Sequence, residues 1–590
     1  MEQRVKPSAT TARVVAAAMA LLLLGSVGGI QAGRTGASFM RDLEIKQPAL
    51  ANIAPWTDDP KTPRLARRVF LVIVDGLRSD HSYQLPFLDE LRRKGVDLEA
   101  QSHYPSWSRP NYVSILTGVP PIASGVRTNF HYTPVLLDSL MDRARAAGLK
   151  VATATDHAIL PSLFLRPVGE GNGKVTIAPE ELEELDIDVM QADPESKTAR
   201  RAPGAMYRTP FHDARYVPWP GGFVEAGTAL VEEYDYELVV LLVSTVDIAG
   251  HAFGADSEEY LEATQVADRA LARVLSKVDL SQDAILVTSD HGHTDAGGHG
   301  GTEPEVLTVP LILAGAGVAN NTIYDARLID LAPTVAALLG FPAPGHGLGK
   351  TLVDLVALDP DARLRRVDAD RLRLLATTST LAVSEARAQA ELLEDRTLRF
   401  VLVASGSALA IVFAVVLYRR RVLRLDLRVL AVAIPAFFLV YYTLIGTLGQ
   451  RFSPSLLPAQ GHITTALIKF AIIGMAVQLL ASLWVLRKYR SLPARLAAAN
   501  GIAWTNLMLS MIPAGLLWAF FPGPSIDVPG PKTLVMIPAV QLTVAATAID
   551  VALVLFVELI VFAARARFRY VPGVMSEPSQ TNPGVDRAPP

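Results

Sequence analysis

Short apolar runs and longer amphipathic stretches alternate over the first two-thirds of the chain. Five continuous apolar runs have the length of a buried strand: Val69–Val74, Val151–Ala154, Leu238–Val243, Ala284–Val287 and Leu311–Ala314. Three stretches with a helical pattern lie between them: Leu85–Lys94, Thr133–Ala147 and Ser257–Val278. Strands that alternate with helices form parallel sheets covered on both faces. The pattern therefore predicts an α/β fold with a mainly parallel sheet.

A different pattern begins near Thr397, where much longer apolar runs appear. Five of them are each long enough to cross a bilayer: residues 400–417, 429–448, 463–485, 502–521 and 533–563. Clusters of Arg and Lys follow alternate runs, beginning with Arg419–Arg421, whereas the intervening loops carry few charges. Because basic loops stay in the cytoplasm, the pattern places the preceding soluble domain on the outer side.

The start of the chain agrees with this topology. Residues 1–13 are polar and net basic, and the apolar run Val14–Ile30 carries no charge. This predicts a membrane anchor, with a cleaved signal peptide as the alternative. We therefore expect a multi-pass protein of the cytoplasmic membrane whose soluble domain is extracytoplasmic, in the periplasm or the extracellular space.

These patterns divide the chain into five parts. We expect an anchor or signal at residues 1–33, a linker at 34–64, an extracytoplasmic domain at 65–395, a membrane domain of five transmembrane helices at 397–570, and a disordered cytoplasmic tail at 571–590. Residues 166–235 are acidic and rich in Pro and Gly. Because they interrupt the strand–helix alternation, they predict an insertion or cap near the functional site.

Charge and cysteine content narrow the possible functions. The chain has 55 Lys and Arg against 58 Asp and Glu, a formal net charge of -3, so we expect no binding to a nucleic-acid polymer. It has no cysteine, which excludes disulfides and thiolate metal sites. Any metal ion must therefore be held by His, Asp, Glu or hydroxyl oxygen.

Residues able to bind metal stand at the carboxyl ends of the predicted strands, where open α/β sheets bind their ligands. They fall into four groups: Asp75; Ser108; Asp247 with His251; and Asp290 with His291 and His299. Carboxylates and imidazoles gathered with one hydroxyl suit two divalent cations, which can clamp the attacking and leaving oxygens of a phosphoryl transfer. The stretch Asn111–Gly118 is typical of the first turns of a helix, which would direct backbone N–H groups at a phosphate.

Two motifs carry a resemblance to a known family. They are Pro105-Ser-Trp-Ser-Arg-Pro110 and Ser289-Asp-His-Gly-His-Thr-Asp-Ala-Gly-Gly-His-Gly300, supported by Asp330–Thr334 with Leu338–Gly340. Over residues 67–350 the chain resembles the alkaline phosphatase superfamily, in particular its type I phosphodiesterase/nucleotide pyrophosphatase group. It is also similar to the catalytic domains of glycosylphosphatidylinositol (GPI) ethanolamine-phosphate transferases. The resemblance implies an alkaline-phosphatase-like fold with helices on both faces of the sheet.

The resemblance also implies roles for particular residues. One metal would be held by Asp75, Ser108, Asp290 and His291, and the other by Asp247, His251 and His299. Ser108 would be the nucleophile and form a covalent phospho-enzyme. Asn129 matches an asparagine that contacts a phosphate oxygen in nucleotide pyrophosphatases.

Neighbouring residues allow functional and structural interpretations. Trp107 could stack on a substrate base or head group, or it could simply pack. Arg109 could touch the substrate phosphate, with a surface role as the alternative. His293 matches no ligand position, so we expect a solvent-exposed loop residue.

The expected cofactors are two divalent ions, with Zn²⁺ favoured by His and carboxylate ligands and Mn²⁺ as the alternative. The expected activity is that of a membrane-anchored phosphodiesterase or phosphoryl-group hydrolase. A phosphoethanolamine-type transferase and a non-catalytic membrane binding or assembly protein are the alternatives. Five helices exceed what an anchor requires, which favours a lipid-linked substrate. Asp550 and Glu558 lie within the last apolar run, either as functional groups or as a packed pair.

Overall fold

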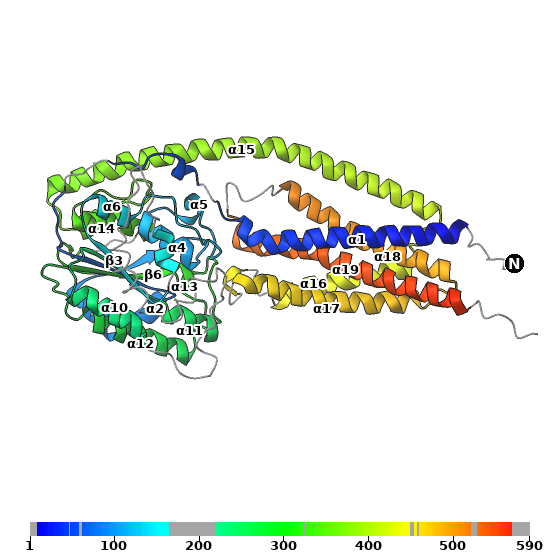
Figure 1. The fold of residues 1–590 in the computed structure, drawn as a ribbon, viewed down its shortest axis with the longest axis horizontal. Coiled ribbons are helices and arrows are strands. Elements are labelled where there is room, and N and C mark those ends of the chain that lie inside the picture. Colours follow the sequence, from blue (N-terminus) through cyan, green and yellow to red (C-terminus); the bar gives the residue numbers. More distant parts are fainter. Residues whose placement is uncertain are drawn as a thin grey trace, which may run out of the picture.

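The computed structural model combines a sheet-containing domain with a bundle of long helices, and both are seen side on in Figure 1. It describes residues 9–45, 48–57, 62–157, 159–164, 220–321, 325–448, 453–456, 460–520 and 528–568. Most of the predicted insertion at 166–235 and the whole tail at 571–590 lie outside the described residues.

A seven-stranded sheet in the order β3-β4-β1-β5-β6-β2-β7 forms the centre of the first domain. The strands are β1 (Val69–Val74), β2 (Gly95–Gln101), β3 (Val151–Thr155), β4 (Leu238–Val243), β5 (Ala284–Thr288), β6 (Thr308–Gly315) and β7 (Ala326–Arg327). Strands β3, β4, β1 and β5 run parallel, whereas β6 is antiparallel to both β5 and β2. This arrangement confirms the predicted mainly parallel α/β fold.

Alternate residues of each central strand face opposite layers, because side chains alternate across a pleated sheet. On β1, Leu71 and Ile73 join a buried cluster with residues of α4 (Ser108–Thr117), α6 (Leu140–Ala146) and α14 (Leu331–Leu339). Phe70 and Val72 join the other cluster, with α3 (Pro86–Lys94), α10 (Gly221–Glu232) and α12 (Glu258–Leu275). Helices therefore cover both faces of the sheet, as Figure 1 shows.

The strand register aligns the ends of three neighbouring strands. Val69 of β1 lies opposite Leu238 of β4 and Ala284 of β5, and Val74 lies opposite Val243. Parallel strands in this register end at the same edge of the sheet. The loops that follow β1, β4 and β5 therefore meet there.

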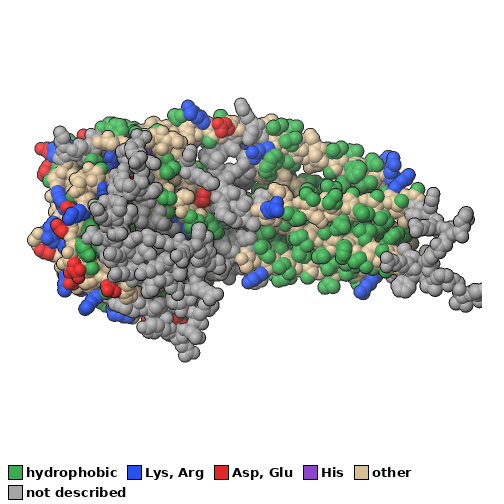
Figure 2. Space-filling model, viewed as in Figure 1, with side chains coloured by type: hydrophobic (Ala, Val, Ile, Leu, Met, Phe, Trp, Pro, Cys, Tyr) green, Lys and Arg blue, Asp and Glu red, His purple; other side chains and the backbone are tan. Residues whose placement is uncertain are grey.

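The long helices are α1 (Ala9–Asp42), α15 (Pro360–Arg419), α16 (Pro435–Leu448), α17 (Gln460–Leu486), α18 (Leu492–Phe520) and α19 (Pro531–Phe568), with a π-helical turn at Val429–Ala433 before α16. Within the described residues, six helical segments are long and apolar enough to cross a membrane. Figure 2 shows hydrophobic side chains covering this part, while acidic and basic side chains gather on the sheet-containing domain. We call these helices the membrane domain. Helix α15 runs without a break through the boundary predicted between 395 and 397.

Candidate active site

Loops after three parallel strands bring the predicted site residues together. Asp75 follows β1 directly, and Asp290 follows β5 by two residues. After β4 the chain enters α11 (Thr245–Phe253), where Asp247 and His251 are four residues apart and share one helix face. Ser108 is the first residue of α4.

One cluster consists of Asp75, Asp290 and His291, with Ser108 beside it. His291 Nε2 lies 3.4 Å from Asp75 Oδ1 and 3.2 Å from Asp290 Oδ2. Ser108 Oγ lies 3.2 Å from the same nitrogen. All four residues are buried. The four residues expected to share one metal thus converge on one point.

A second cluster surrounds Asp247. Its Oδ1 lies 3.4 Å from His251 Nε2, 3.5 Å from His299 Nε2 and 2.9 Å from His293 Nε2. The ring of His299 stacks on that of His291, with centroids 3.6 Å apart, so the two clusters adjoin. His251, Asp247 and His299 were expected together, and the structure places them together.

The expectation that His293 is exposed is wrong. Its side chain is fully buried. The ring fills a slot beside two glycines, since a Cβ at Gly250 would lie 2.6 Å from it and one at Gly76 3.0 Å. Gly76 and Gly250 make room for this ring, and their contact with His293 is visible only in the fold.

Hydrogen bonds to the second ring nitrogen assign a tautomer to each buried histidine, because a carbonyl oxygen can only accept. His299 Nδ1 donates to Ser106 O at 2.8 Å, and His291 Nδ1 donates to Gly292 O at 3.1 Å. In both residues Nε2 therefore carries no proton and can act as a metal ligand. His293 is the reverse case: its Nδ1 accepts from Gly298 N at 3.1 Å, so Nε2 carries the proton and donates to Asp247.

The site concentrates negative charge in a place with little solvent. Burial, reinforced by the charges of Asp290 and Asp247, raises the pKa of Asp75 well above its usual range. Burial also raises the pKa of Asp290. Burial acts to raise the pKa of Asp247 too, but the charges of His251 and His299 and the His293 hydrogen bond outweigh it and lower that pKa well below normal.

These donors fit divalent cations. Asp75 Oδ1 and Asp290 Oδ2 are buried and have no hydrogen-bond partner among the described residues. Buried carboxylate oxygens without partners are costly unless a cation binds them. Asp75, Asp290 and His291 form one group with ligand atoms close enough to share an ion. Asp247, His291, His293 and His299 form another by distance, but the proton assigned to His293 Nε2 makes that nitrogen a donor to Asp247 and not a ligand.

Three further predicted residues surround the start of α4. Asn129 Oδ1 accepts a hydrogen bond from Arg109 N at 3.0 Å, which places Asn129 next to Ser108. The Arg109 guanidinium donates to His131 O at 2.6 Å and stacks on Tyr132 at 4.1 Å. Trp107 is buried against Leu43 and Leu534, which favours the packing interpretation of this residue.

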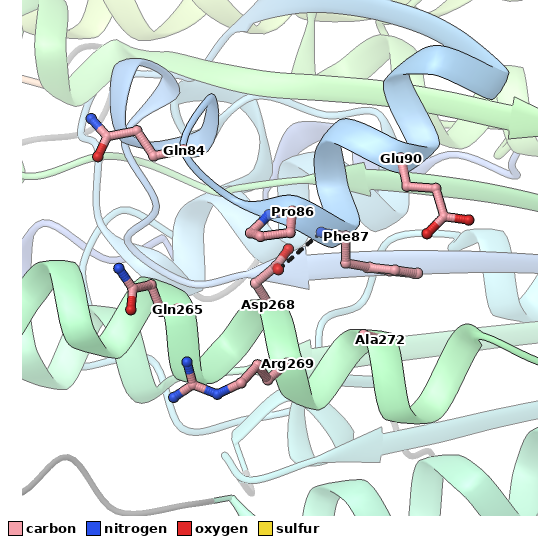
Figure 3. Close-up of a pocket in the computed structure, with 8 residues that line it drawn as sticks. All are labelled: Gln84, Pro86, Phe87, Glu90, Gln265, Asp268, Arg269 and Ala272. Atoms are coloured by element: carbon pink, nitrogen blue, oxygen red, sulfur yellow. Dashed lines mark hydrogen bonds between the residues drawn. The ribbon is translucent and has the colours of Figure 1, made fainter.

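A separate pocket lies between α3 and α12, with a volume of about 540 Å³. Figure 3 shows Asp268 in it, with the carboxylate bonded to the backbone of Phe87. A second bond, to Leu88 N at 3.0 Å, caps the start of α3. This acidic group is thus part of the fold, and the pocket shares no lining residue with the two clusters.

The sequence around these loops is similar to that of known proteins. Residues 69–304 match the family model of type I phosphodiesterase / nucleotide pyrophosphatase. The match confirms the resemblance carried by the two motifs. The matched residues 69–304 include all seven predicted ligand positions.

Among curated relatives, the chain is similar to GPI ethanolamine phosphate transferase 1 from Homo sapiens, with 24% identity over 53% of this chain and 35% of the relative. It is 35% identical to the 2,3-bisphosphoglycerate-independent phosphoglycerate mutase of Ruegeria pomeroyi over 20% of this chain and 24% of that protein. The solved alkaline phosphatase PafA shares 12% identity over 50% of this chain and 100% of that one, with a TM-score of 0.37. The chain spans about a third of the length of the curated transferases it matches.

Proposed function

We propose that Ser108 attacks the phosphorus of a phosphodiester and releases one alcohol. The remaining phosphate ester, bound to Ser108 as a covalent phospho-enzyme, then passes to water or to a second hydroxyl compound. The proposed location is the outer side of the cytoplasmic membrane. The position of Ser108 carries the proposal, because its Oγ lies 3.2 Å from His291 Nε2 among buried carboxylates. A serine hydroxyl becomes a useful nucleophile only where its surroundings favour the alkoxide.

Two divalent ions belong to the proposal, Zn²⁺ first and Mn²⁺ as the alternative. Seven residues would hold them: Asp75, Ser108, Asp290 and His291 for one ion, and Asp247, His251 and His299 for the other. Ions bound there would stabilise negative charge on the attacking and leaving oxygens. Nitrogen and oxygen donors without sulfur suit these metals.

The chain's own groups would act in two steps. Ser108 Oγ gives up its proton and forms a bond to phosphorus as the bond to one ester oxygen breaks, and that oxygen takes up a proton and leaves as an alcohol. Water or a hydroxyl group then forms its own bond to phosphorus, and the bond to Ser108 Oγ breaks. Asn129 is bonded to Arg109 N through Oδ1, and we propose that its Nδ2 donates to a phosphate oxygen.

Transfer to a hydroxyl other than water is the second candidate. Trp107, next to the nucleophile, packs against Leu43 and Leu534 of the membrane domain or its flank, which favours a lipid-linked donor or acceptor. The curated relatives named as GPI ethanolamine phosphate transferases favour an ethanolamine phosphate-type group.

The test uses the full chain in detergent with Zn²⁺ or Mn²⁺ and two chromogenic esters, bis-p-nitrophenyl phosphate and p-nitrophenyl phosphate. Ser108→Ala is expected to lower diester turnover at least about a thousandfold. Ser114→Ala is the matched control, since the Ser114 hydroxyl bonds Pro110 O within the same helix. A burst of nitrophenol equal to the enzyme concentration would report the covalent intermediate on Ser108.

The outcomes separate the alternatives. Metal-dependent diester turnover that is lost only in Ser108→Ala supports the proposal, and glycerol phosphate esters formed when glycerol is added support transfer. A protein that binds no metal and cleaves neither ester contradicts the proposal and leaves a non-catalytic membrane binding protein.

A further inference from the structure

The loop that carries His299 is bonded directly to the membrane domain. A short turn at residues 453–456 lies between α16 and α17 and contains Ser455. Ser455 Oγ accepts a hydrogen bond from Gly301 N at 2.7 Å and donates one to Glu303 Oε2 at 2.5 Å. Ser455 is fully buried. Its hydroxyl therefore satisfies a backbone donor that faces no solvent.

Gly301 is in turn tied to both the nucleophile segment and the His299 loop. Ser106 Oγ donates to Gly301 O at 2.9 Å and accepts from Gly300 N at 2.9 Å. The carbonyl of Ser106 accepts from His299 Nδ1 at 2.8 Å. Ser106 is two residues before Ser108, so these hydrogen bonds fix the position of the nucleophile relative to the His299 imidazole.

A second contact links the nucleophile segment to the membrane domain. Trp107 packs against Leu43, just after α1, and Leu534, in the first turn of α19. Tyr104 OH donates to Pro529 O at 2.5 Å. The nucleophile segment and the His299 loop thus contact three separate parts of the membrane domain or its flanks: the end of α1, the start of α19, and the turn that contains Ser455.

We infer that the membrane domain is a structural part of the active site, and that Ser455 is a positioning residue for the His299 loop. The inference deepens the proposed function and rests on it for its effect on turnover. The contact itself does not depend on the reaction. Without the Ser455 hydroxyl, Gly301 N–H would be buried without a partner, and the loop would move to satisfy it.

An engineered disulfide tests the contact between Gly301 and Ser455 without an activity assay. The natural chain has no cysteine, so only the introduced pair can form a disulfide. A Cβ at Gly301 would lie 2.6 Å from Ser455 Oγ, 2.4 Å from Ser453 Oγ and 2.3 Å from Glu303 Oε2, so the Ser453 and Glu303 side chains must turn aside for a Cys to fit. One further carbon–oxygen bond puts the two Cβ atoms at most about 4 Å apart, within the range that a disulfide spans. Gly301→Cys with Ser455→Cys is therefore expected to cross-link in the full-length protein under mild oxidation.

The cross-link is detected after cleavage at a protease site inserted between α15 and α16. Fragments that stay joined on a non-reducing gel and separate with reductant report the bond. Gly301→Cys with Gly530→Cys is the control, since a Cβ at Gly530 meets no atom within 4 Å. Separate fragments from the Ser455 pair would overturn the inference and leave the proposed function intact.

Single variants test the positioning role. Ser455→Ala is expected to weaken Zn²⁺ binding and to lower diester turnover, each about tenfold, and to lower the melting temperature by a few degrees, because the buried Gly301 N–H loses its partner. Ser455→Thr keeps the hydroxyl and should restore both. Thr447→Ala is the control, since that exposed hydroxyl bonds Thr443 O in its own helix. Wild-type Zn²⁺ affinity in Ser455→Ala would overturn the role, and this readout stands even if the wild-type protein cleaves neither ester.

Discussion

Replacing His293 tests whether this residue orients a carboxylate or binds metal itself. His293 donates from Nε2 to Asp247 Oδ1 at 2.9 Å and accepts at Nδ1 from Gly298 N at 3.1 Å. His293→Ala removes a hydrogen bond to a charged group, worth about 1.5–3 kcal/mol. That corresponds to roughly 10- to 150-fold weaker Zn²⁺ binding if the whole loss falls on the orientation of Asp247. Losses of this size are typical of residues that orient metal ligands.

The assay is competition for Zn²⁺ with a chromogenic chelator, on the full chain in detergent. His293→Gln is the matched variant, because its amide can still donate toward Asp247. A positioning role predicts that Gln retains most of the affinity that Ala loses. If Gln and Ala lose the same amount, His293 is a direct ligand and the tautomer argument fails. If Ala binds Zn²⁺ as well as the wild type, Asp247 needs no such donor.

Three other expectations concern the site and the domain that carries it. Gly300→Ala should lower both stability and turnover, because Gly300 has φ +111° and its Cβ would lie 2.2 Å from Trp107 Nε1; thermal denaturation with an activity assay measures both. Asp283→Asn should destabilise the protein by about 3–5 kcal/mol, since Arg68 would stay buried without its charge partner. Burial raises the pKa of Asp283, but the hydrogen bonds from Arg67 and Arg68 outweigh it and lower the pKa below normal. The ionised Asp283 therefore stabilises the fold at pH values above the pKa of this carboxyl in the unfolded chain. That stabilisation is lost as the pH falls through the lower pKa in the folded protein, so the melting temperature of the wild type should fall more steeply than that of the variant below about pH 4. Chelation by EDTA should lower the melting temperature, because the buried carboxylates of the site then repel one another; an unchanged value would argue against bound metal.

The sheet was largely predictable because its central strands are buried on both faces and consist of continuous apolar residues. Strand β2 escaped the prediction. It lies next to the edge strand β7, and its residues Gly95–Gln101 alternate between buried and exposed positions. A search for apolar runs passes over such a strand, whereas a search for alternation would find it.

The site was predictable only where chemistry recurs at fixed places along the chain. Asp75, Asp247 and Asp290 follow apolar strands, and parallel strands bring their ends together. The burial of His293 depends on Gly250, which is 43 residues away in the sequence, and the contact of Gly301 with Ser455 joins positions 154 apart. No local pattern encodes such pairs, since each side chain is ordinary until the fold brings in its partner.

The packing of Trp107 on Leu43 and Leu534 has a kinetic consequence. On the proposed function with a lipid-linked substrate, a reaction centre that packs against helices long and apolar enough to cross a bilayer would meet its substrate by diffusion in two dimensions. Its turnover should then follow the mole fraction of substrate in the surface, and inert detergent added at constant bulk concentration should slow it by surface dilution. A small water-soluble ester would show no such dependence. The turnover of that ester should follow its bulk concentration, whereas the turnover of a lipid-linked substrate should follow its mole fraction in the surface.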